Sequence, residues 1–458
     1  MQDFFGYHSE WNLGSPGGWD YQRTTQQIGK KVWALLNEIR PMGVDLDMDH
    51  PFFFPLNGFI EMLVQAHRKR AGKDPGLIAV VAEEETLESV TENRNLAQRL
   101  SSLEGITGAL MAPQELELQD SVVSWRGRPV SILFVDFNTD VLLSLHRKHD
   151  LTPLLQAVRE NRVINPRGTE PINVKSMFEV ISGLRQDRFH SEVVQRTPWT
   201  RRFFPRVTTG PDGEHIDDLV EWTRLNWERL VLKPERGYSG KGVLVSELEN
   251  NADEAVSVAL ATSDYIVQEK IPLHLWAEEI PVVDRDRKEI ILKNFQTDFR
   301  SLLGPRGLFG FLCRFGGVPT NVGSGGGVQP LAVLRSDMSV KDAVGRINEA
   351  ILRIGYDDLH RIFEMQGKMA LDHDFTYLLG PIEIAVRPRV LTYRQCAALE
   401  RYCEALWSDC LTLEEMWRAG EMDEMVCQSS QELEIARMQP WLGGPAIFAS
   451  DGLFNFLQ

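Results

Sequence analysis

The segment 230–243 constrains the fold more than any other part of the sequence. It reads Leu-Val-Leu-Lys-Pro-Glu-Arg-Gly-Tyr-Ser-Gly-Lys-Gly-Val: an apolar strand that ends at Lys233, a glycine-rich turn, and the start of a second apolar strand. A lysine at a strand end offers a compact positive charge to phosphate oxygens, and glycines let successive backbone N–H groups face an anion. We therefore expect a phosphate-binding loop, built from Gly237, Gly240 and Gly242 and covered by Tyr238, Ser239 and Lys241.

Two familiar phosphate loops do not fit this segment. A P-loop requires Ser or Thr after its Gly-Lys pair, whereas Lys241 is followed by Gly242. The glycine order of protein kinases, G-x-G-x-x-G, occurs here in reverse. An ordinary hairpin with a basic turn stays open as the alternative, because glycine-rich turns between strands are common.

Length and charge limit the class of protein. A chain of 458 residues with 43% apolar and 25% charged residues is typical of a globular protein of about two to four domains. The 49 basic and 65 acidic residues give a formal net charge of −16. Because such a charge repels nucleic acid and anionic membrane surfaces, we expect neither as a partner.

The cysteines and the first residues indicate the compartment. Cys396, Cys403 and Cys410 are seven residues apart in a helical stretch and so share one face. This favours core packing in a reducing cytoplasm over a metal site. The start, Met-Gln-Asp-Phe-Phe, lacks the basic and apolar regions of a secretory signal, and no segment approaches a membrane span. A cytoplasmic protein is expected.

Apolar runs predict an α/β chain. Strands at 77–82 and 130–136 with a helix at 88–103 predict a Rossmann-like layer over 76–165. Residues 230–270 read strand, loop, strand, helix, strand. The other expected helices are 25–38, 56–69, 174–184, 217–230, 340–354 and a group from 392, and the other expected strands are 291–303, 308–314 and 376–386.

Two terminal regions have less regular patterns. Residues 1–75, with the loop Gly14–Gly18, are expected to shape an acceptor pocket, and the apolar tail 431–458 is expected to pack on the core or on another subunit. The acids Asp45, Asp47 and Asp49 do not form an EF-hand, because the sixth and twelfth loop positions lack the required glycine and glutamate. These acids either face a cationic substrate or lie in a solvated loop, and the solvated loop is the favoured interpretation.

Three motifs in order resemble the nucleotide site of the ATP-grasp superfamily: Lys175, then Lys233 with its glycine turn, then Gln268-Glu269 at the end of the following strand. The order and spacing are most similar to carboxylate–amine ligases of the circularly permuted, glutathionylspermidine-synthetase-like type, as are the segments 125–130 and 163–166. The resemblance implies two α/β subdomains that clasp ATP, over 166–272 and 273–430, preceded by a Rossmann-like pre-ATP-grasp domain.

The same resemblance implies roles for individual residues. Lys175 and Lys233 hold phosphates, the loop from Glu235 to Gly242 covers them, and a hinge strand meets adenine through Gln268, Glu269, Lys270 and Ile271. Asp298-x-Arg300, Arg314 and the segment 321–327 look like the part that orients the γ-phosphate and the carboxylate. Arg300 and Arg314 are then catalytic, because fixed cations stabilise the developing charge, and the substrate contacts are Asp298, Ser324 and Gly325. A structural salt bridge of Asp298 with Arg300 or a neighbour is the competing account.

The magnesium ligands implied by the resemblance match less well. The candidates are Asp374 and Glu383, but Ala385 stands where the superfamily has an asparagine. Either Asn321 or water supplies the missing oxygen ligand, or the alignment with the superfamily is shifted, or the protein has lost its activity. The function implied is an ATP- and Mg²⁺-dependent ligase that joins a small carboxylate to an amine through an acyl phosphate, in a protein that forms a homo-oligomer if the tail packs between subunits. A small-molecule kinase and an inactive nucleotide-binding protein are the alternatives.

Overall fold

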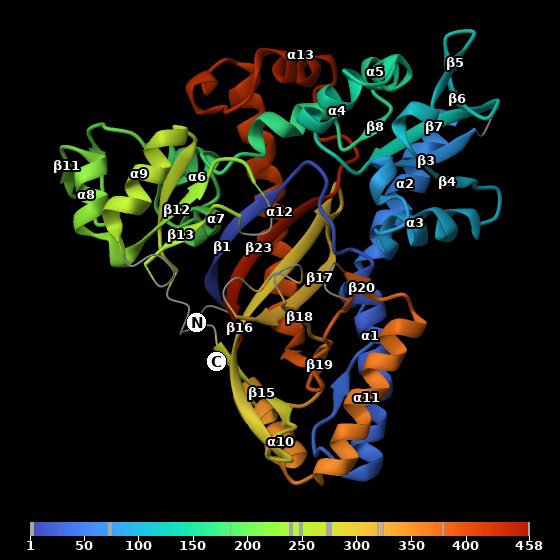
Figure 1. The fold of residues 1–458 in the computed structure, drawn as a ribbon, viewed down its shortest axis with the longest axis vertical. Coiled ribbons are helices and arrows are strands. Elements are labelled where there is room, and N and C mark those ends of the chain that lie inside the picture. The colour runs from blue at the N-terminus through green and yellow to red at the C-terminus, as the bar shows by residue number, and fades with distance from the viewer. Residues whose placement is uncertain are drawn as a thin grey trace.

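The computed structural model describes residues 4–71, 76–183, 185–237, 241–246, 251–271, 277–317, 320, 322, 325–377 and 380–456. The fold is mixed α/β, with a central antiparallel sheet and lobes on either side of it (Figure 1). None of the helices in these ranges is long and apolar enough to cross a bilayer. Of the predicted residues, Tyr238, Ser239, Gly240, Asn321 and Ser324 lie outside the described ranges.

The central sheet joins both ends of the chain. The first strand, β1 (Phe5–Asn12), pairs antiparallel with the last, β23 (Phe448–Asn455), and β23 pairs with β16 (Glu289–Gly304). Beyond β16 the sheet continues with β17 (Gly307–Gly316) and β18 (Gly327–Val328), while β15 (Ala277–Asp284) pairs with the first half of β16. The first and last strands of the chain therefore belong to the central sheet, with β1 at its edge.

The two faces of this sheet differ in chemistry because alternate residues of a strand point to opposite sides. Phe299, Phe311 and Phe454 belong to the apolar core that includes α12 (Tyr393–Arg418). The buried thiols of Cys396, Cys403 and Cys410 lie in the same core, and burial raises their pKa values, which confirms the prediction of core packing. The opposite face carries the charged side chains described below.

A four-stranded antiparallel sheet forms the lobe at the left of Figure 1. Its strand order is β13 (Leu244–Val245), β12 (Leu230–Pro234), β14 (Tyr265–Glu269), β9 (Thr200–Arg202). The helices α8 (Leu219–Leu225) and α9 (Ala252–Thr262) pack against it. The predicted order of strand, loop, strand, helix, strand over 230–270 is confirmed; β12 lies between β13 and β14 and runs antiparallel to both.

The strands and the helix predicted for the region 76–165 are present. The strands form a third sheet, and the helix packs against it. Its parallel strands are β4 (Gly108–Met111), β3 (Leu77–Val81), β7 (Arg128–Val135) and β8 (Val163–Ile164). The ribbon β5 (Glu117–Gln119) and β6 (Val122–Trp125) extends β7 antiparallel. Core contacts come from α2 (Pro55–Ala71) and α3 (Thr91–Ser101). Polar residues that follow β3 and β7 therefore meet at one edge of the sheet.

The remaining elements close the fold around these sheets. The lower lobe of Figure 1 contains α1 (Tyr21–Ile39), α10 (Val340–Leu352) and α11 (Tyr356–Asp372), and β19 (Leu331–Leu334) pairs with β2 (Leu46–Asp47) and β22 (Arg389–Leu391). The other elements are α4 (Thr139–His146), α5 (Thr152–Arg159), α6 (Met177–Ser182), α7 (Ser191–Arg196), α13 (Ser430–Met438), β10 (Thr208–Thr209) and β11 (His215–Ile216).

In this half of the chain, one predicted strand was wrong and one helix was not predicted. The strand expected at 376–386 is a short hairpin of β20 (Thr376–Tyr377) and β21 (Gly380–Pro381), because its two arms pair with each other. The helix α11 was not predicted. Its buried residues Leu359, Ile362, Gln366 and Ala370 recur at helical spacing, but the polar Gln366 interrupts the apolar pattern of this face.

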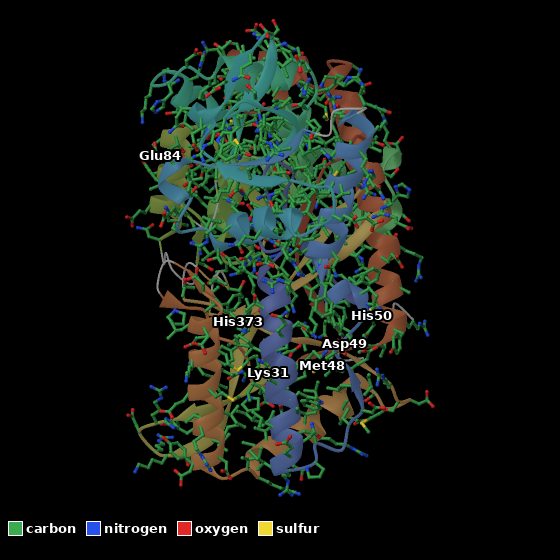
Figure 2. All side chains as sticks on the ribbon, turned by 90° about the vertical axis from the view of Figure 1, so that its right-hand side faces the viewer. Lys31, Met48, Asp49, His50, Glu84 and His373 are labelled. Atoms are coloured by element: carbon green, nitrogen blue, oxygen red, sulfur yellow. The ribbon has the colours of Figure 1, made fainter. Side chains whose placement is uncertain are left out.

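The acidic loop at 45–49 is tied into the protein by surface contacts. Asp47 accepts a hydrogen bond from the Tyr393 hydroxyl at 2.9 Å and lies 3.4 Å from a guanidinium nitrogen of Arg335. Asp49 forms an ion pair with Lys30 of α1, and Figure 2 shows Asp49 and His50 beside that helix, where Lys31 is labelled. The interpretation as a surface loop fits these contacts.

Candidate functional site

The first part of the site lies between the four-stranded sheet and β1, around the ammonium group of Lys233. Lys233 Nζ donates to Gln268 Oε1 on β14 at 2.7 Å and to the carbonyl of Ser9 on β1 at 3.3 Å. Gln268 is held in turn, because its Nε2 donates to Thr200 Oγ1 at 2.9 Å. An ammonium has three donors, so these two bonds orient Lys233 and leave one donor for a ligand.

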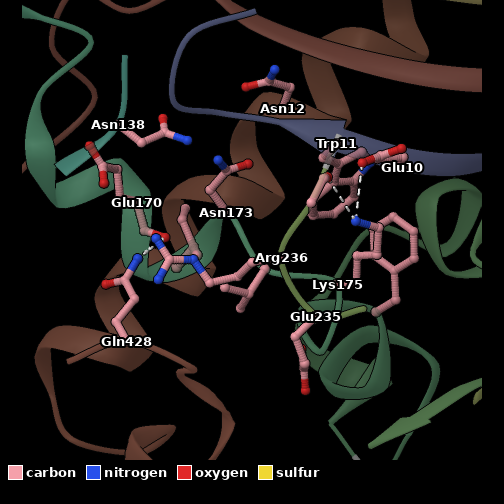
Figure 3. Close-up of a pocket in the computed structure, with 14 residues that line it drawn as sticks. Glu10, Trp11, Asn12, Asn138, Glu170, Asn173, Lys175, Glu235, Arg236 and Gln428 are labelled. Atoms are coloured by element: carbon pink, nitrogen blue, oxygen red, sulfur yellow. Dashed lines mark hydrogen bonds and ion pairs between the residues drawn. The ribbon is translucent and has the colours of Figure 1, made fainter. Parts of the chain in front are cut away.

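Lys175 brings a second ammonium to the same place. Its Nζ lies 3.2 Å from Glu10 Oε1 and 3.4 Å from the carbonyl oxygen of Gly237, as Figure 3 shows for the Glu10 pair. Burial, with a contribution from Lys175, lowers the pKa of Lys233 to about 8, while Glu10 acts in the opposite direction. The structure thus brings together the two lysines that the sequence singled out, with Glu10 as a shared counter-ion.

The local structure around Lys175 differs from the expectation. The helix predicted over 174–184 is α6, which begins at Met177, so Lys175 lies in the turn before it. Glu235 holds this turn: its Oε2 accepts from the Ser176 backbone N–H at 3.1 Å and its Oε1 lies 3.2 Å from Arg202 Nε. The carboxylate of Glu235 is nearly fully buried and points away from Lys175 in Figure 3. It therefore positions Lys175.

A pocket, called the lysine pocket below, opens beside Lys175 (Figure 3), and Lys233 is not among the residues that line it. Its walls include Trp11, Asn12 and Asn173, and Arg236 lies on the side opposite Glu10. Arg236 is oriented by Glu432 at 2.7 Å. The sequence interpretation missed both Glu10 and Arg236. The signal for Arg236 was available, since it stands between Glu235 and Gly237 at the base of the glycine loop.

Part of the predicted covering loop can be placed. Gly237 has φ of +150° and Gly242 has φ of +74°, backbone conformations that residues other than glycine rarely adopt. The Gly242 carbonyl accepts a hydrogen bond from the Tyr265 hydroxyl at 2.9 Å, and Lys241 is exposed. Glycine is therefore required at both ends of this loop.

The predicted hinge has one feature that suits a base and one that does not. The side chain of Ile271 packs with Leu453 on β23 and Tyr7 on β1, which lie opposite each other in the central sheet. This is an apolar contact between the end of the four-stranded sheet and the central sheet. The backbone N–H groups of Glu269 and Lys270, however, donate to the carbonyls of Trp199 and Arg229, both at 2.8 Å. The Lys270 ammonium donates to Ser246 Oγ at 3.0 Å.

The predicted catalytic arginines lie on the polar face of the central sheet. Asp298 is directly opposite Arg314, and Arg300 is directly opposite Asp451 of the last strand. Arg314 Nε lies 2.7 Å from Asp298 and its Nη2 lies 3.0 Å from Asp451, while Arg300 binds both oxygens of Asp451 at 2.6 and 2.7 Å. These partners raise the pKa of Arg314 and lower that of Asp451.

This ionic cluster answers the question of a structural salt bridge. Salt bridges are present, but Arg300 pairs with Asp451 and Asp298 pairs with Arg314. The sequence interpretation missed Asp451, whose signal was a single acid within the apolar segment 448–456. Arg300 also donates to the Gly17 carbonyl at 2.8 Å, which anchors the Gly14–Gly18 loop.

The two parts of the site are adjacent. Arg300 and Arg314 line a second pocket with Gly17 and Gly18 of the N-terminal loop, and Asn12 and Asn138 line both this pocket and the lysine pocket. The two pockets are therefore neighbours that share Asn12 and Asn138.

Two of the predicted metal ligands, Asp374 and Glu383, lie within the described residues. Asp374 forms an ion pair with Arg94, and Glu383 is an exposed residue whose carbonyl accepts from Val328 N–H at 2.8 Å. Gly325 is placed in a turn with φ of +87°. Across the residues that the structure describes, no three His, Cys, Asp or Glu side chains converge to hold a metal ion. Because Mg²⁺ is commonly held by one or two carboxylates together with substrate phosphates, a magnesium site stays a prediction from the sequence.

Comparisons with known proteins add limited information. No protein-family model and no curated protein matches the chain. The solved structures similar to it include the ATP-grasp ligase PsnB complexed with a minimal precursor (12% identity, 61% of this chain, 83% of that chain, TM-score 0.31), a RimK-domain ATP-grasp protein from Sphaerobacter thermophilus (15%, 60%, 99%, 0.29), and the D-cycloserine synthetase DcsG (13%, 63%, 82%, 0.26). At these TM-scores the likeness carries no argument, so the interpretation rests on the site.

Proposed function

We propose that this protein is an ATP-dependent carboxylate–amine ligase with an ATP-grasp architecture, in which the four-stranded sheet and the central sheet hold ATP between them. The observation that carries the proposal is the convergence of Lys175 and Lys233 on the polar face of the central sheet, beside a loop with two positive-φ glycines. Two ammonium groups served by one carboxylate, Glu10, leave positive charge for phosphate oxygens.

The proposed reaction has two steps. A substrate carboxylate oxygen attacks the γ-phosphorus of ATP, and the bond to the β-phosphate oxygen breaks to give an acyl phosphate and ADP. The lone pair of an amine then attacks the acyl carbon, phosphate leaves, and the nitrogen loses its proton to give an amide. In this scheme the lysines hold the phosphates, and Arg300 and Arg314 face the acyl group and its developing charge.

The base would lie against Ile271, Tyr7 and Leu453, and the glycine loop would exclude water from the acyl phosphate. We further propose that residues 76–165 act as a Rossmann-like pre-ATP-grasp domain. Magnesium, a cytoplasmic location and homo-oligomerisation stay predictions from the sequence.

One observation favours a second candidate, a protein that binds the nucleotide without ligase chemistry. Both arginines already have carboxylate partners, so neither brings free positive charge to a transition state. The ligase, a kinase and a binding protein differ in when they release ADP. The ligase releases ADP only when both an acid and an amine are present; a kinase would release it with one partner, and a binding protein would release none.

The test is to incubate the purified protein with ATP in magnesium buffer and with pools of small carboxylic acids, amines, or both, and to measure ADP and phosphate. We expect release only with both pools, and none from Lys233→Met. The matched control is Lys148→Met, which changes an exposed lysine that lines neither pocket. ADP release that needs only one of the two pools, or that occurs without either pool, would rule out the ligase.

A further inference from the structure

An acidic edge lies at the carboxyl ends of the parallel strands β3 and β7. Glu83 comes two residues after β3 and Asp136 directly follows β7, and both line the pocket that contains Arg300 and Arg314. In this sheet β4 lies on one side of β3 and β7 lies on the other, with β8 beyond β7. The connection from β3 to β4 and the connection from β7 to β8 therefore run in opposite directions, and they diverge between β3 and β7. Ligands of open α/β sheets bind outside the strand ends at such a point.

Among the residues that the structure describes, neither of the two carboxylates has a cationic partner. Asp136 accepts a hydrogen bond from Asn93 Nδ2 at 2.7 Å, and within the described ranges no lysine, arginine or histidine forms an ion pair with Asp136 or Glu83. Burial and the nearby charge of Glu83 raise the pKa of Asp136 to about 6. Two like charges in one pocket repel each other, and a bound cation relieves that repulsion.

Asn93 gives an independent indication of a ligand. It lines the same pocket and is 1% exposed, and its buried Oδ1 accepts no hydrogen bond from the residues that the structure describes. Exchanging the amide oxygen and nitrogen would place oxygen against the Asp136 carboxylate, so the bond from Nδ2 fixes the orientation. A buried acceptor without a donor is costly, and a ligand that donates to it removes the cost.

Glu92 shares the pocket but is already used. Its carboxylate accepts the backbone N–H groups of Gly18 at 2.8 Å and Asp20 at 2.7 Å. It therefore stabilises the N-terminal loop and the start of α1. The acceptors left for a ligand come from Glu83, Asp136 and Asn93.

We propose that Glu83, Asp136 and Asn93 form a subsite for a primary ammonium group, that of the amine substrate. This inference rests on the proposed ligase function. An ammonium carries three donors, which matches the three acceptor groups. The subsite shares its pocket with Arg300 and Arg314, so the nitrogen would be held beside the acyl group that it attacks.

The test uses direct binding to the whole protein saturated with ADP. The probes are the α-amides of the uncharged common amino acids, which carry an α-ammonium and no carboxylate; the N-acetylated amides, which lack the charge, are the controls. The variants are Asp136→Asn and Glu83→Gln, and Glu85→Gln makes the same charge change at an exposed neighbour that does not line the pocket. Thermal unfolding and calorimetric titration give the readouts.

We expect at least one amide to bind the wild type and Glu85→Gln equally, and to bind Asp136→Asn and Glu83→Gln at least tenfold more weakly. N-acetylated amides should not bind. Without ligand, Asp136→Asn should unfold at a higher temperature than the wild type at pH 8, because it removes a buried charge; a merely structural role would lower that temperature. This separates a binding role from a fault in folding.

Three results would overturn the inference: no amide binds, binding is unchanged in both pocket variants, or MgCl₂ alone gives a stabilisation that depends on Asp136. The last would make the cluster a metal site. The ligase proposal fails separately. If ADP release needs both acid and amine but the KM for the amine is unchanged in Asp136→Asn, the subsite is wrong and the ligase proposal stands. If amides bind through Asp136 but ADP release never needs an amine, the subsite stands and the ligase proposal is wrong.

Discussion

The lysine end and the arginine end of the site hold their positive charges in different ways. At the lysine end, Lys175 and Lys233 share a single carboxylate, Glu10, and burial lowers the pKa of Lys233 to about 8. At the arginine end, two guanidinium groups face two carboxylates, and the pKa of Arg314 is raised. The lysine end is therefore prepared for an incoming anion, whereas the arginine end is a preformed, charge-balanced scaffold.

The largest expected effect is on stability at the arginine end. Asp451→Asn leaves Arg300 and Arg314 with too little negative charge inside the protein, and breaking a buried ion pair costs about 3–5 kcal/mol. Urea unfolding measures the loss. Glu289→Gln, at an exposed position of the same β16 strand, should change the free energy of unfolding by less than about 0.5 kcal/mol.

A double variant sharpens this prediction. Adding Arg300→Met to Asp451→Asn restores the balance of one arginine and one aspartate, so part of the stability should return. Strictly additive losses would show that Arg300 and Asp451 are not energetically coupled.

The opposite sign is expected at the lysine end. Lys233→Met removes a buried cation whose pKa is lowered, and we expect the free energy of unfolding at pH 7 to rise by about 1 kcal/mol after the lost hydrogen bonds are counted. Between the folded pKa of about 8 and the ordinary value of 10.5, the unfolded chain binds more protons than the folded one. Wild-type stability should therefore gain on the variant as pH rises through this window. A variant less stable than the wild type at pH 7 would contradict the contrast between the two ends.

The smallest expected effect concerns the counter-ion of the lysines. Glu10→Gln removes the carboxylate that competes with phosphate for Lys175, so the affinity for ATP should rise by about threefold to tenfold, or about 1 kcal/mol. Titration calorimetry measures it. Glu38→Gln, at an exposed position of α1, is the matched control and should leave the affinity unchanged. A weaker affinity in Glu10→Gln would show that Glu10 is not competing with the nucleotide.

Local patterns predicted the elements around Lys233. The strand that contains Lys233, the hairpin after it, the helix and the strand that contains Gln268 are where the sequence placed them, because apolar periodicity and glycine positions are local signals. The long helix with three buried cysteines and the strands carrying Arg300 and Arg314 were found for the same reason.

What the sequence did not predict depends on pairing between distant segments. Glu10 and Asp451 come from opposite ends of the chain and reach the site only because β1, β23 and β16 are neighbours. Their side chains face the site because of the strand register, which no local pattern specifies. Asp136 and Glu83 meet in the same way, through the parallel pairing of β3 with β7.

The most direct test of the account is the affinity of a non-hydrolysable ATP analogue for the wild type, Lys233→Met and Lys148→Met, measured by titration calorimetry. Loss of one charge-assisted contact to phosphate corresponds to about 2–3 kcal/mol, so binding to Lys233→Met should be weaker by about 30-fold or more. The wild type and Lys148→Met should bind equally. Equal affinity of all three proteins would show that Lys233 is not part of a nucleotide site and would contradict the account.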